Sequence, residues 1–244
     1  MTIDNIYDQL SGEQPFRFNE EVAKVFPDML KRSIPGYEAT IEAIGSLAAR
    51  YVQPNTNCYD LGCSLGAATL AMRQGIEKPG CRIIAVDSAT AMTERCEKII
   101  AANSRQADRT TTVNVIADDI RSVSIENASM VVLNYTLQFL AMDDRDALMR
   151  SICDGMNDGG LLVLSEKVVD ESAAMEELLI DLYHEHKRRN NYSALEISRK
   201  RAALENVLIP ETVAAHRERL ANAGFSHTAI WLRYFNFVSI IAIR

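Results

Sequence analysis

The residues from 60 to 66 combine an acid, two glycines and a hydroxyl, a composition that suits the binding of a nucleotide-like ligand. They read Asp60-Leu61-Gly62-Cys63-Ser64-Leu65-Gly66 and end an apolar run that begins at Cys58. Glycine lets the backbone turn sharply and approach a ligand closely. A second acid, Asp87, ends the next apolar run, 21 positions after Gly66. A carboxylate at that distance is placed to accept hydrogen bonds from two ribose hydroxyls.

The ligand of this turn is either NAD or S-adenosylmethionine. Ser64 stands where a dinucleotide fingerprint has the glycine that lets the backbone approach the pyrophosphate. A sulfonium amino acid needs no such approach, and the opening acid Asp60 also favours S-adenosylmethionine. A third acid, Asp119, follows another apolar run and is placed to accept from an adenine amino group, with the Ile120 amide nearby. Asp119 is alternatively a carboxylate that only caps a turn.

Residues 62–66 also spell G-x-S-x-G, the pattern of the nucleophile elbow in α/β-hydrolases. In that interpretation Ser64 is acylated, and His216 or His227 acts as the base. The elbow of such enzymes follows several strands, whereas here the pattern follows the first predicted strand. His216 is also expected on the surface of a helix and His227 at the start of a strand. The order and the placement therefore disfavour a hydrolase.

The composition is that of a globular protein with a sizeable core and no surface made for nucleic acid. Among 244 residues 48% are hydrophobic and 24% are charged, and the formal net charge is −7. This acidic balance disfavours a surface that grips phosphate backbones. The five cysteines are odd in number and lack C-x-x-C spacing, which is typical of free thiols in a reducing compartment. With no signal peptide and no apolar run of bilayer length, we expect a cytoplasmic protein.

The elements that position these residues alternate between strand and helix from residue 57 onward. Apolar runs predict strands at 58–61, 81–86, 112–116, 130–133 and 161–164, separated by helices at 67–74, 92–102 and 144–156. Apolar strands separated by helices indicate a parallel sheet covered on both faces. A helix at 210–223 and strands at 228–234 and 237–243 end the chain. The sequence therefore predicts an α/β, Rossmann-like fold with three layers.

Two helical segments stand outside this alternation. Residues 1–55 are predicted to form an N-terminal arm, with helices beginning near residues 19 and 37. The segment 168–207 is too long for a loop and is predicted as a helical insertion, with helices at 172–188 and 193–207. We expect one domain, 1–244, in which both segments cover the site or pair subunits. The apolar side chains of the insertion alternatively belong to the core; these are Leu178, Leu179 and Leu182.

Longer blocks resemble the carboxy-S-adenosyl-L-methionine synthase family of the class I methyltransferase superfamily. The blocks are Arg32 to Tyr37 (RSIPGY), Asp60 to Thr69, 126–140 (ENASMVVLNYTLQFL), Leu164 to Lys167 (LSEK), 192–207 (YSALEISRKRAALENV) and Phe235 to Phe237. The resemblance runs from about residue 16 to the C-terminus. It implies a mostly parallel seven-stranded sheet with an antiparallel last strand. It also implies that S-adenosylmethionine and prephenate are converted into carboxy-S-adenosylmethionine and phenylpyruvate, without a metal.

The same resemblance implies a role for ten residues. Gly62, Cys63 and Ser64 would line the amino-acid end of the cofactor, Asp87 and Ser88 would meet the ribose, Asp119 and Ile120 the adenine, and Asn134 the reacting end. Tyr37 and Arg201 would act at the new carboxylate, which a guanidinium can hold with two parallel hydrogen bonds. Arg201 alternatively forms an i,i+4 pair with Glu205 on a solvated helix face.

The resemblance further implies that the product feeds a partner enzyme, which carboxymethylates a wobble uridine of tRNA on the way to 5-oxyacetyl uridine. An enzyme that only prepares the donor needs no RNA-binding surface, which agrees with the negative charge. The basic clusters 187–189 and 199–201 are then ordinary surface charge, or they attract a dianionic substrate. We expect a homodimer that binds neither nucleic acid nor membrane directly.

Two further functions remain open from the sequence. The chain is alternatively an ordinary S-adenosylmethionine-dependent methyltransferase that acts on a small molecule or on RNA. It is alternatively a non-catalytic module that binds the cofactor and scaffolds the tRNA enzyme.

Overall fold

A computed structural model describes residues 3–9, 15–103 and 111–244 of the chain. The strands are β1 (Asn57–Leu61), β2 (Arg82–Asp87), β3 (Thr112–Ala117), β4 (Ala128–Asn134), β5 (Met156–Val169), β6 (Glu211–Thr212), β7 (His227–Tyr234) and β8 (Phe237–Ile243). The helices are α1 (Ile6–Gln9), α2 (Glu20–Ser33), α3 (Tyr37–Tyr51), α4 (Ala67–Gly75), α5 (Thr90–Asn103), the short 3₁₀ turn η2 (Leu137–Phe139), α6 (Met142–Gly155), α7 (Ala173–Arg189), α8 (Ala194–Leu204) and α9 (Val213–Ala223). The tract 103–111, which the family resemblance marks as longer than usual and as an expected surface insertion, lies almost wholly outside the described residues.

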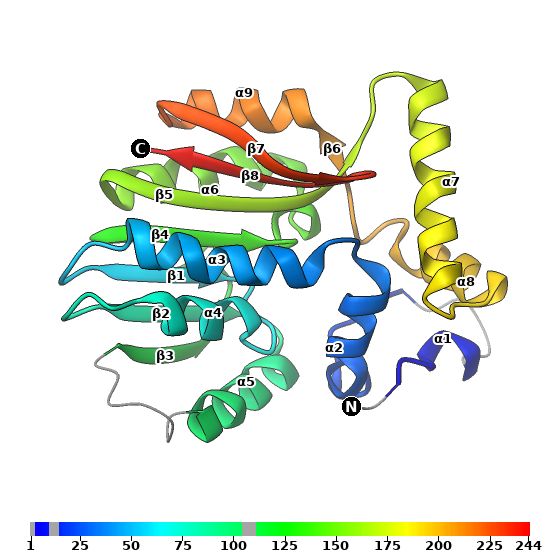
Figure 1. Cartoon of the computed structure of the whole chain (residues 1–244), viewed down its shortest axis with the longest axis horizontal. Helices are drawn as coiled ribbons and strands as arrows, with labels where there is room; N and C mark the ends of the chain where they lie inside the picture. The colour runs from blue at the N-terminus through cyan, green and yellow to red at the C-terminus, as the bar shows by residue number, and fades with distance from the viewer. Residues whose placement is uncertain (1–2, 10–14, 104–110) are drawn as a thin grey trace.

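The strands form one sheet in the order β3-β2-β1-β4-β5-β8-β7 (Figure 1). The pairs among β1 to β5 are parallel, whereas β8 is antiparallel to both of its neighbours. The two-residue strand β6 pairs with the end of β5 outside this path. The predicted α/β fold is therefore confirmed, including the mostly parallel sheet and the antiparallel last strand.

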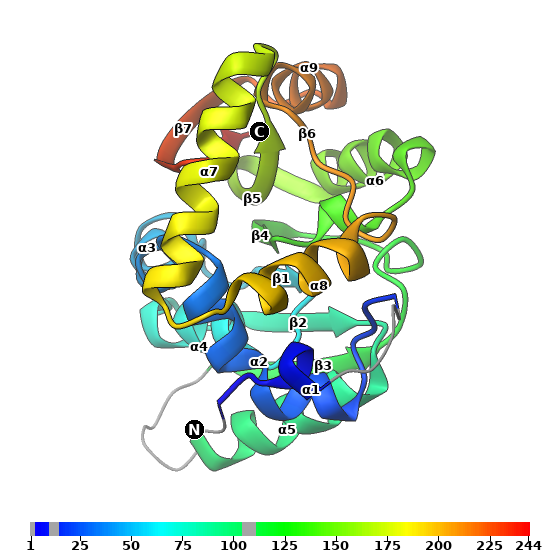
Figure 2. The same ribbon diagram turned by 90° about the vertical axis from the view of Figure 1, so that its right-hand side faces the viewer.

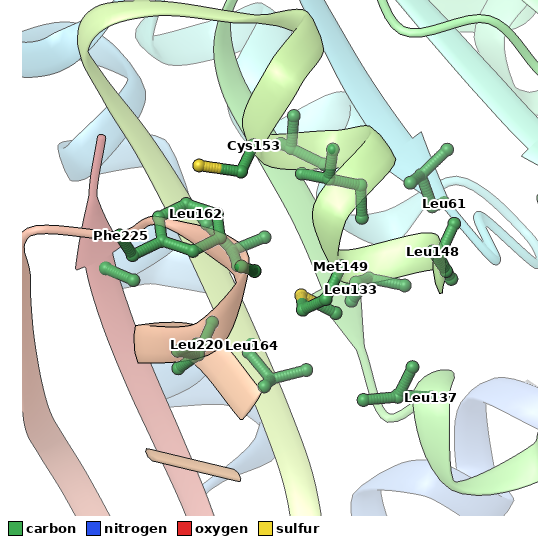
Figure 3. Packing of buried hydrophobic residues seen from close by; sticks show 14 of the residues in the cluster. Leu61, Leu133, Leu137, Leu148, Met149, Cys153, Leu162, Leu164, Leu220 and Phe225 are labelled. Atoms are coloured by element: carbon green, nitrogen blue, oxygen red, sulfur yellow. The ribbon is translucent and has the colours of Figure 1, made fainter. Parts of the chain in front are cut away.

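Neighbouring residues of the central strands are buried on opposite faces of the sheet. Met130 and Val132 of β4 join a cluster with α3 and α4, whereas Val131 and Leu133 join a cluster with α6 and α9. The second cluster includes Met149 and is shown in Figure 3. A strand buried on both faces reads as a continuous apolar run, which explains why these strands were predictable.

Several element boundaries differ from the sequence prediction, and two of them have a clear local cause. Strand β5 begins at Met156, which pairs with Ala128, rather than at the predicted residue 161, so the segment 157–160 belongs to an irregular start of this strand. Helix α9 begins at Val213 rather than at residue 210, because the Thr212 side chain accepts a hydrogen bond from the Ala215 amide and caps the helix. Ser193 and Glu196 form a capping box at the start of α8, where the sequence predicts a helix from residue 193.

Four of the helices outside the alternating pattern, α1, α2, α7 and α8, lie beyond the carboxyl ends of the parallel strands, whereas α3 packs on one face of the sheet (Figure 1). The arrows of β3 and β4 in Figure 1 point toward the side where α1, α2, α7 and α8 lie. Figure 2 looks onto this side and shows α7 and α8 in front of the strand ends. Of the three leucines that the sequence left as candidate core residues, none is buried in the chain, and Leu178 is 49% exposed. No helix among the described residues is long and apolar enough to cross a membrane.

Contacts far apart in sequence hold α2 against the region that joins α7 to α8. The Arg32 guanidinium donates to the Asn190 carbonyl at 2.7 Å, to the Asn191 carbonyl at 2.8 Å and to the Asp4 carbonyl at 2.9 Å. It also lies 4.0 Å from the centre of the Tyr192 ring. One arginine of α2 therefore links the N-terminal arm to the helical insertion.

A buried ion cluster joins α6 to α9. Arg145 is fully buried and lies 2.5 Å from the Glu211 carboxylate, which also accepts from Arg219 at 2.7 Å. His216 lies beside this cluster and is 1% exposed, so the prediction that it is a surface residue was wrong. Neither of its ring nitrogens has a hydrogen-bond partner in the described part of the chain. Burial lowers the pKa of His216 to about 4.

We predict that His216 weakens the fold in mild acid. Because the folded state holds His216 neutral and the unfolded state does not, stability is lost as the pH falls from about 6.5 to about 4. The loss should reach about 3 kcal/mol of unfolding free energy. Urea unfolding at pH 7 and pH 4.5 should show a smaller acid loss for His216→Leu than for the parent chain. The exposed His227 supplies the control His227→Gln, which should behave as the parent; an equal acid loss in His216→Leu would contradict the prediction.

Candidate active site

One cavity of about 740 Å³ opens where the carboxyl ends of β1, β2 and β4 meet α2, α7 and α8. All ten site residues predicted from the sequence line it: Tyr37, Gly62, Cys63, Ser64, Asp87, Ser88, Asp119, Ile120, Asn134 and Arg201. They come from segments up to 164 positions apart, from Tyr37 to Arg201. Ligands of open parallel sheets bind at this edge, so the cavity is the candidate active site.

The glycine turn is held by the neighbouring strand. The amides of Gly62 and Cys63 both donate to the Val86 carbonyl, at 2.8 and 2.9 Å. Gly62 has φ +84°, and a Cβ there would lie 2.3 Å from the Thr136 hydroxyl. Glycine is therefore required at this position for both its conformation and its lack of a side chain.

Two carboxylates lie behind this turn. Asp87 accepts from the Ser64 amide at 2.8 Å and from the Ala89 amide at 2.9 Å, and burial raises its pKa. Each carboxylate oxygen can accept a second hydrogen bond, so Asp87 retains capacity for ribose hydroxyls. Asp60 is 1% exposed and accepts from the Thr69 hydroxyl at 2.5 Å, and burial raises its pKa to about 6.

The Asp119 carboxylate already has hydrogen-bond and ion-pair partners within the chain, which the sequence did not reveal. It accepts from the Arg121 amide at 2.9 Å and pairs with the Arg121 guanidinium, which also contacts Asp144. The hydrogen bonds from Arg121 lower the pKa of Asp119. These contacts agree with the alternative in which Asp119 caps a turn. The neighbouring Ile120 is buried and lines the cavity.

The middle of the cavity carries polar groups that lack partners. The Oδ1 atom of Asn134 and the hydroxyl of Tyr135 are buried without a hydrogen-bond partner in the described ranges. Tyr135 also has φ +63°, a conformation that is strained for a residue with a side chain. Tyr37 lies near Asp60, and burial raises its pKa. Unpaired groups at the end of β4 fit a polar ligand such as S-adenosylmethionine.

The far end of the cavity is lined by cations. Lys167, Lys187, Lys200 and Arg201 all contribute to its wall. Lys187 and Lys200 are each 5% exposed, so the interpretation of both basic clusters as ordinary surface charge was wrong for these two lysines. No ion pair joins Arg201 to Glu205 in the described structure, although both residues are exposed, so the solvated helix face of the alternative is present and its i,i+4 pair is not.

The sequence contains a signal for the buried lysines that charge counting misses. Lys187 follows the buried Tyr183 by four positions, which places both on one face of α7. Lys200 shares a face of α8 with Ile197 and Ala203, which are buried. Helical spacing from a buried apolar residue therefore distinguishes the buried Lys187 from its exposed neighbour Arg188. It likewise distinguishes the buried Lys200 from the nearby exposed Ser198.

The hydrolase interpretation finds no support in this geometry. The Ser64 hydroxyl contacts the Met92 sulfur at 3.6 Å, and neither His216 nor His227 lines the cavity. Among the described residues no group of three or more His, Cys, Asp or Glu side chains could hold a metal ion.

Fold and sequence comparisons agree on the class of protein. An O-methyltransferase family protein from Burkholderia thailandensis superposes with a TM-score of 0.65 at 14% identity, covering 98% of this chain and 67% of that one. A methyltransferase-domain family profile matches residues 59–160. The fold is that of the class I methyltransferases.

Close relatives narrow this class to one family. Carboxy-S-adenosyl-L-methionine synthase of Vibrio vulnificus (strain YJ016) is 56% identical over 229 residues, which cover 94% of this chain and 92% of the relative. The synthase of Klebsiella pneumoniae (strain 342) is 54% identical over 227 residues, covering 93% and 90%. The chain belongs to the carboxy-S-adenosyl-L-methionine synthase family.

We predict that Gly62→Ala weakens binding of S-adenosylmethionine about 10- to 100-fold, because the added methyl group displaces Thr136 and the turn. Isothermal titration calorimetry measures this change directly. The matched control is Gly159→Ala, since Gly159 has φ +74° but nothing within 4 Å of an added Cβ. Both variants should lose about 1–2 kcal/mol of stability from the left-handed conformation. Equal affinities for the two variants would contradict the prediction.

Proposed function

We propose that this protein converts S-adenosylmethionine and prephenate into carboxy-S-adenosylmethionine, phenylpyruvate and water. The observation that carries the proposal is the cation-lined end of the cavity, which adjoins the predicted sulfonium site near Asn134. A methyl transfer needs no such cluster of positive charge. A reaction that takes up a dianion and attaches a carboxylate to the donor does need it.

The proposed reaction balances without a protein nucleophile. Prephenate becomes aromatic by losing its ring carboxyl group as carbon dioxide together with a hydroxide. The hydroxide removes a proton from the methyl group of the sulfonium, which is acidic beside the positive sulfur, and water forms. The resulting carbanion attacks carbon dioxide, and the new C–C bond gives the carboxylate of the product.

In this scheme the residues of the chain orient the reacting groups and exclude water from the cavity. Arg201 holds the transferred carboxyl group. Burial is the largest cause that lowers the pKa values of Lys167 and His184, and the positive charge of Arg201 lies near enough to lower them further. Tyr37 and Asn134 orient the reacting end of the donor. Helices α2 and α8 cover the cavity and keep out water, which would otherwise protonate the carbanion and dilute the carbon dioxide.

Further properties belong to the same proposal. The product serves a partner enzyme that carboxymethylates the wobble uridine of tRNA in 5-oxyacetyl uridine biosynthesis, and this chain, as one domain in the cytoplasm, binds no nucleic acid itself. The net charge of −7 supports that separation of roles. We further propose a homodimer, which exposed apolar side chains of α7 support; Met175 is 46% exposed and Leu178 is 49% exposed.

An ordinary methyltransferase is the second candidate, because the fold alone is shared with enzymes of that class. Mass spectrometry after incubation with S-adenosylmethionine, with and without prephenate, separates the two. A nucleoside heavier by one carbon dioxide, formed only with prephenate, supports the proposal. Unmodified donor in both samples, or the demethylated nucleoside alone, contradicts it. Turnover by the isolated chain would also exclude a non-catalytic scaffold.

We predict that Arg201→Ala loses affinity for carboxy-S-adenosylmethionine about 10- to 100-fold, because a charge-assisted hydrogen bond contributes about 1.5–3 kcal/mol. The affinity for S-adenosylmethionine should stay within about twofold, since that ligand lacks the added carboxylate. Calorimetry with both ligands measures the difference, and Arg188→Ala, at an exposed position outside the cavity wall, is the control. An equal loss for both ligands would show that Arg201 has no carboxylate-specific role.

A further inference from the structure

The lysines at the cationic end of the cavity differ in what they contact. Lys200 donates to the Ser33 hydroxyl at 2.8 Å and lies 3.7 Å from the Asp4 carboxylate. Asp4 also accepts from the Tyr192 hydroxyl at 2.5 Å. Lys200 is therefore neutralised by its own surroundings and serves to fasten α8 to the N-terminal arm.

Lys187 has no such partner. Its ammonium lies 4.4 Å from the centre of the Tyr183 ring and makes no hydrogen bond or ion pair in the described part of the chain. Burial is the largest cause that lowers its pKa, followed by the positive charges of Lys200 and Lys167. The Lys187 residue is 5% exposed, and an unpaired charge on so buried a residue is costly unless a ligand supplies the missing negative charge.

Lys167 lies near the same aromatic ring. Its ammonium is 5.5 Å from the centre of the Tyr183 ring, so both lysines lie beside this tyrosine. The Lys167 amide donates to the Gln138 side chain at 3.0 Å, and the adjacent Glu166 accepts from the amides of Leu137 and Gln138 at 2.9 and 3.0 Å. Lys167 is thus carried on a rigid strand end, whereas Lys187 comes from α7.

We propose that Lys187, assisted by Lys167, binds the carboxylate of the substrate that is not transferred. This inference rests on the proposed function, in which the substrate has two carboxylates with different fates. One leaves the ring and is attached to the donor, beside Arg201 of α8. The other stays on the three-carbon side chain and keeps its charge from substrate to product. Two carboxylates with separate fates need two separate cations, and the cavity wall presents them on two helices.

The retained carboxylate does not change during the reaction, so its cation should stabilise substrate and transition state equally. Loss of such an interaction raises KM and leaves kcat nearly unchanged. We expect Lys187→Met to raise the KM for prephenate about 10- to 100-fold, with kcat within about threefold of the parent. The affinity for S-adenosylmethionine should be unaffected. Methionine keeps the length of the side chain and removes an unpaired buried charge, so the melting temperature should not fall.

Phenylpyruvate tests which carboxylate Lys187 holds, because this product carries only the retained one. Its inhibition constant should rise in Lys187→Met by a factor similar to that of the KM for prephenate. Arg201→Ala should leave the inhibition constant for phenylpyruvate within about twofold. The control Arg188→Met removes a positive charge one position away, on the exposed side of α7, and should behave as the parent.

Three outcomes would overturn the inference. They are an unchanged KM in Lys187→Met, a fall in kcat at constant KM, or a raised KM with unchanged inhibition by phenylpyruvate. Each of these outcomes counts against the inference when the parent chain makes carboxy-S-adenosylmethionine in the same assay. Failure of the parent chain to do so with prephenate would instead contradict the proposed function, so the two results are distinguishable.

Discussion

An unpaired positive charge on a buried lysine in the cavity wall is the constraint on which the rest of this structure depends. Water would stabilise the lysine ammonium of α7 far better than a tyrosine ring does. The fold therefore has to hold that charge in place by geometry, with α7, α8 and the N-terminal arm fastened to one another around it. Arg32 and Asp4 provide this fastening through bonds to backbone and side-chain groups more than 150 positions away.

Where the strands of the sheet line the same cavity, the wall carries acidic rather than basic side chains. Asp60 and Asp87 are buried acids at the ends of β1 and β2, and both have raised pKa values because burial disfavours their charge. A donor that carries an ammonium and a sulfonium relieves this cost when it binds. The cavity thus runs from acidic strand ends to basic helix faces, which matches a cationic donor placed beside an anionic substrate.

The sequence predicted those elements and residues that are determined by their immediate sequence neighbours. The central strands are buried on both faces and read as apolar runs, and the glycine turn with Asp87 has a fixed spacing. Prediction from the sequence was wrong where tertiary contacts determine the structure. The start of β5 depends on pairing with Ala128, and His216 is buried because α9 packs beside Arg145. Lys187 and Lys200 looked like members of charged runs, and only the helix faces on which they lie reveal that they are buried.

The bond between Tyr192 and Asp4 also has a consequence for how the chain is made. The two residues are 188 positions apart, so during synthesis the N-terminal arm emerges long before the helices that it contacts. Such long-range contacts form late, since the entropy of closing the intervening loop must first be overcome. A nascent chain can therefore form β1 to β5 while the side of the donor site that α8 covers still lies open, and this cover can form only after residue 200 has left the ribosome.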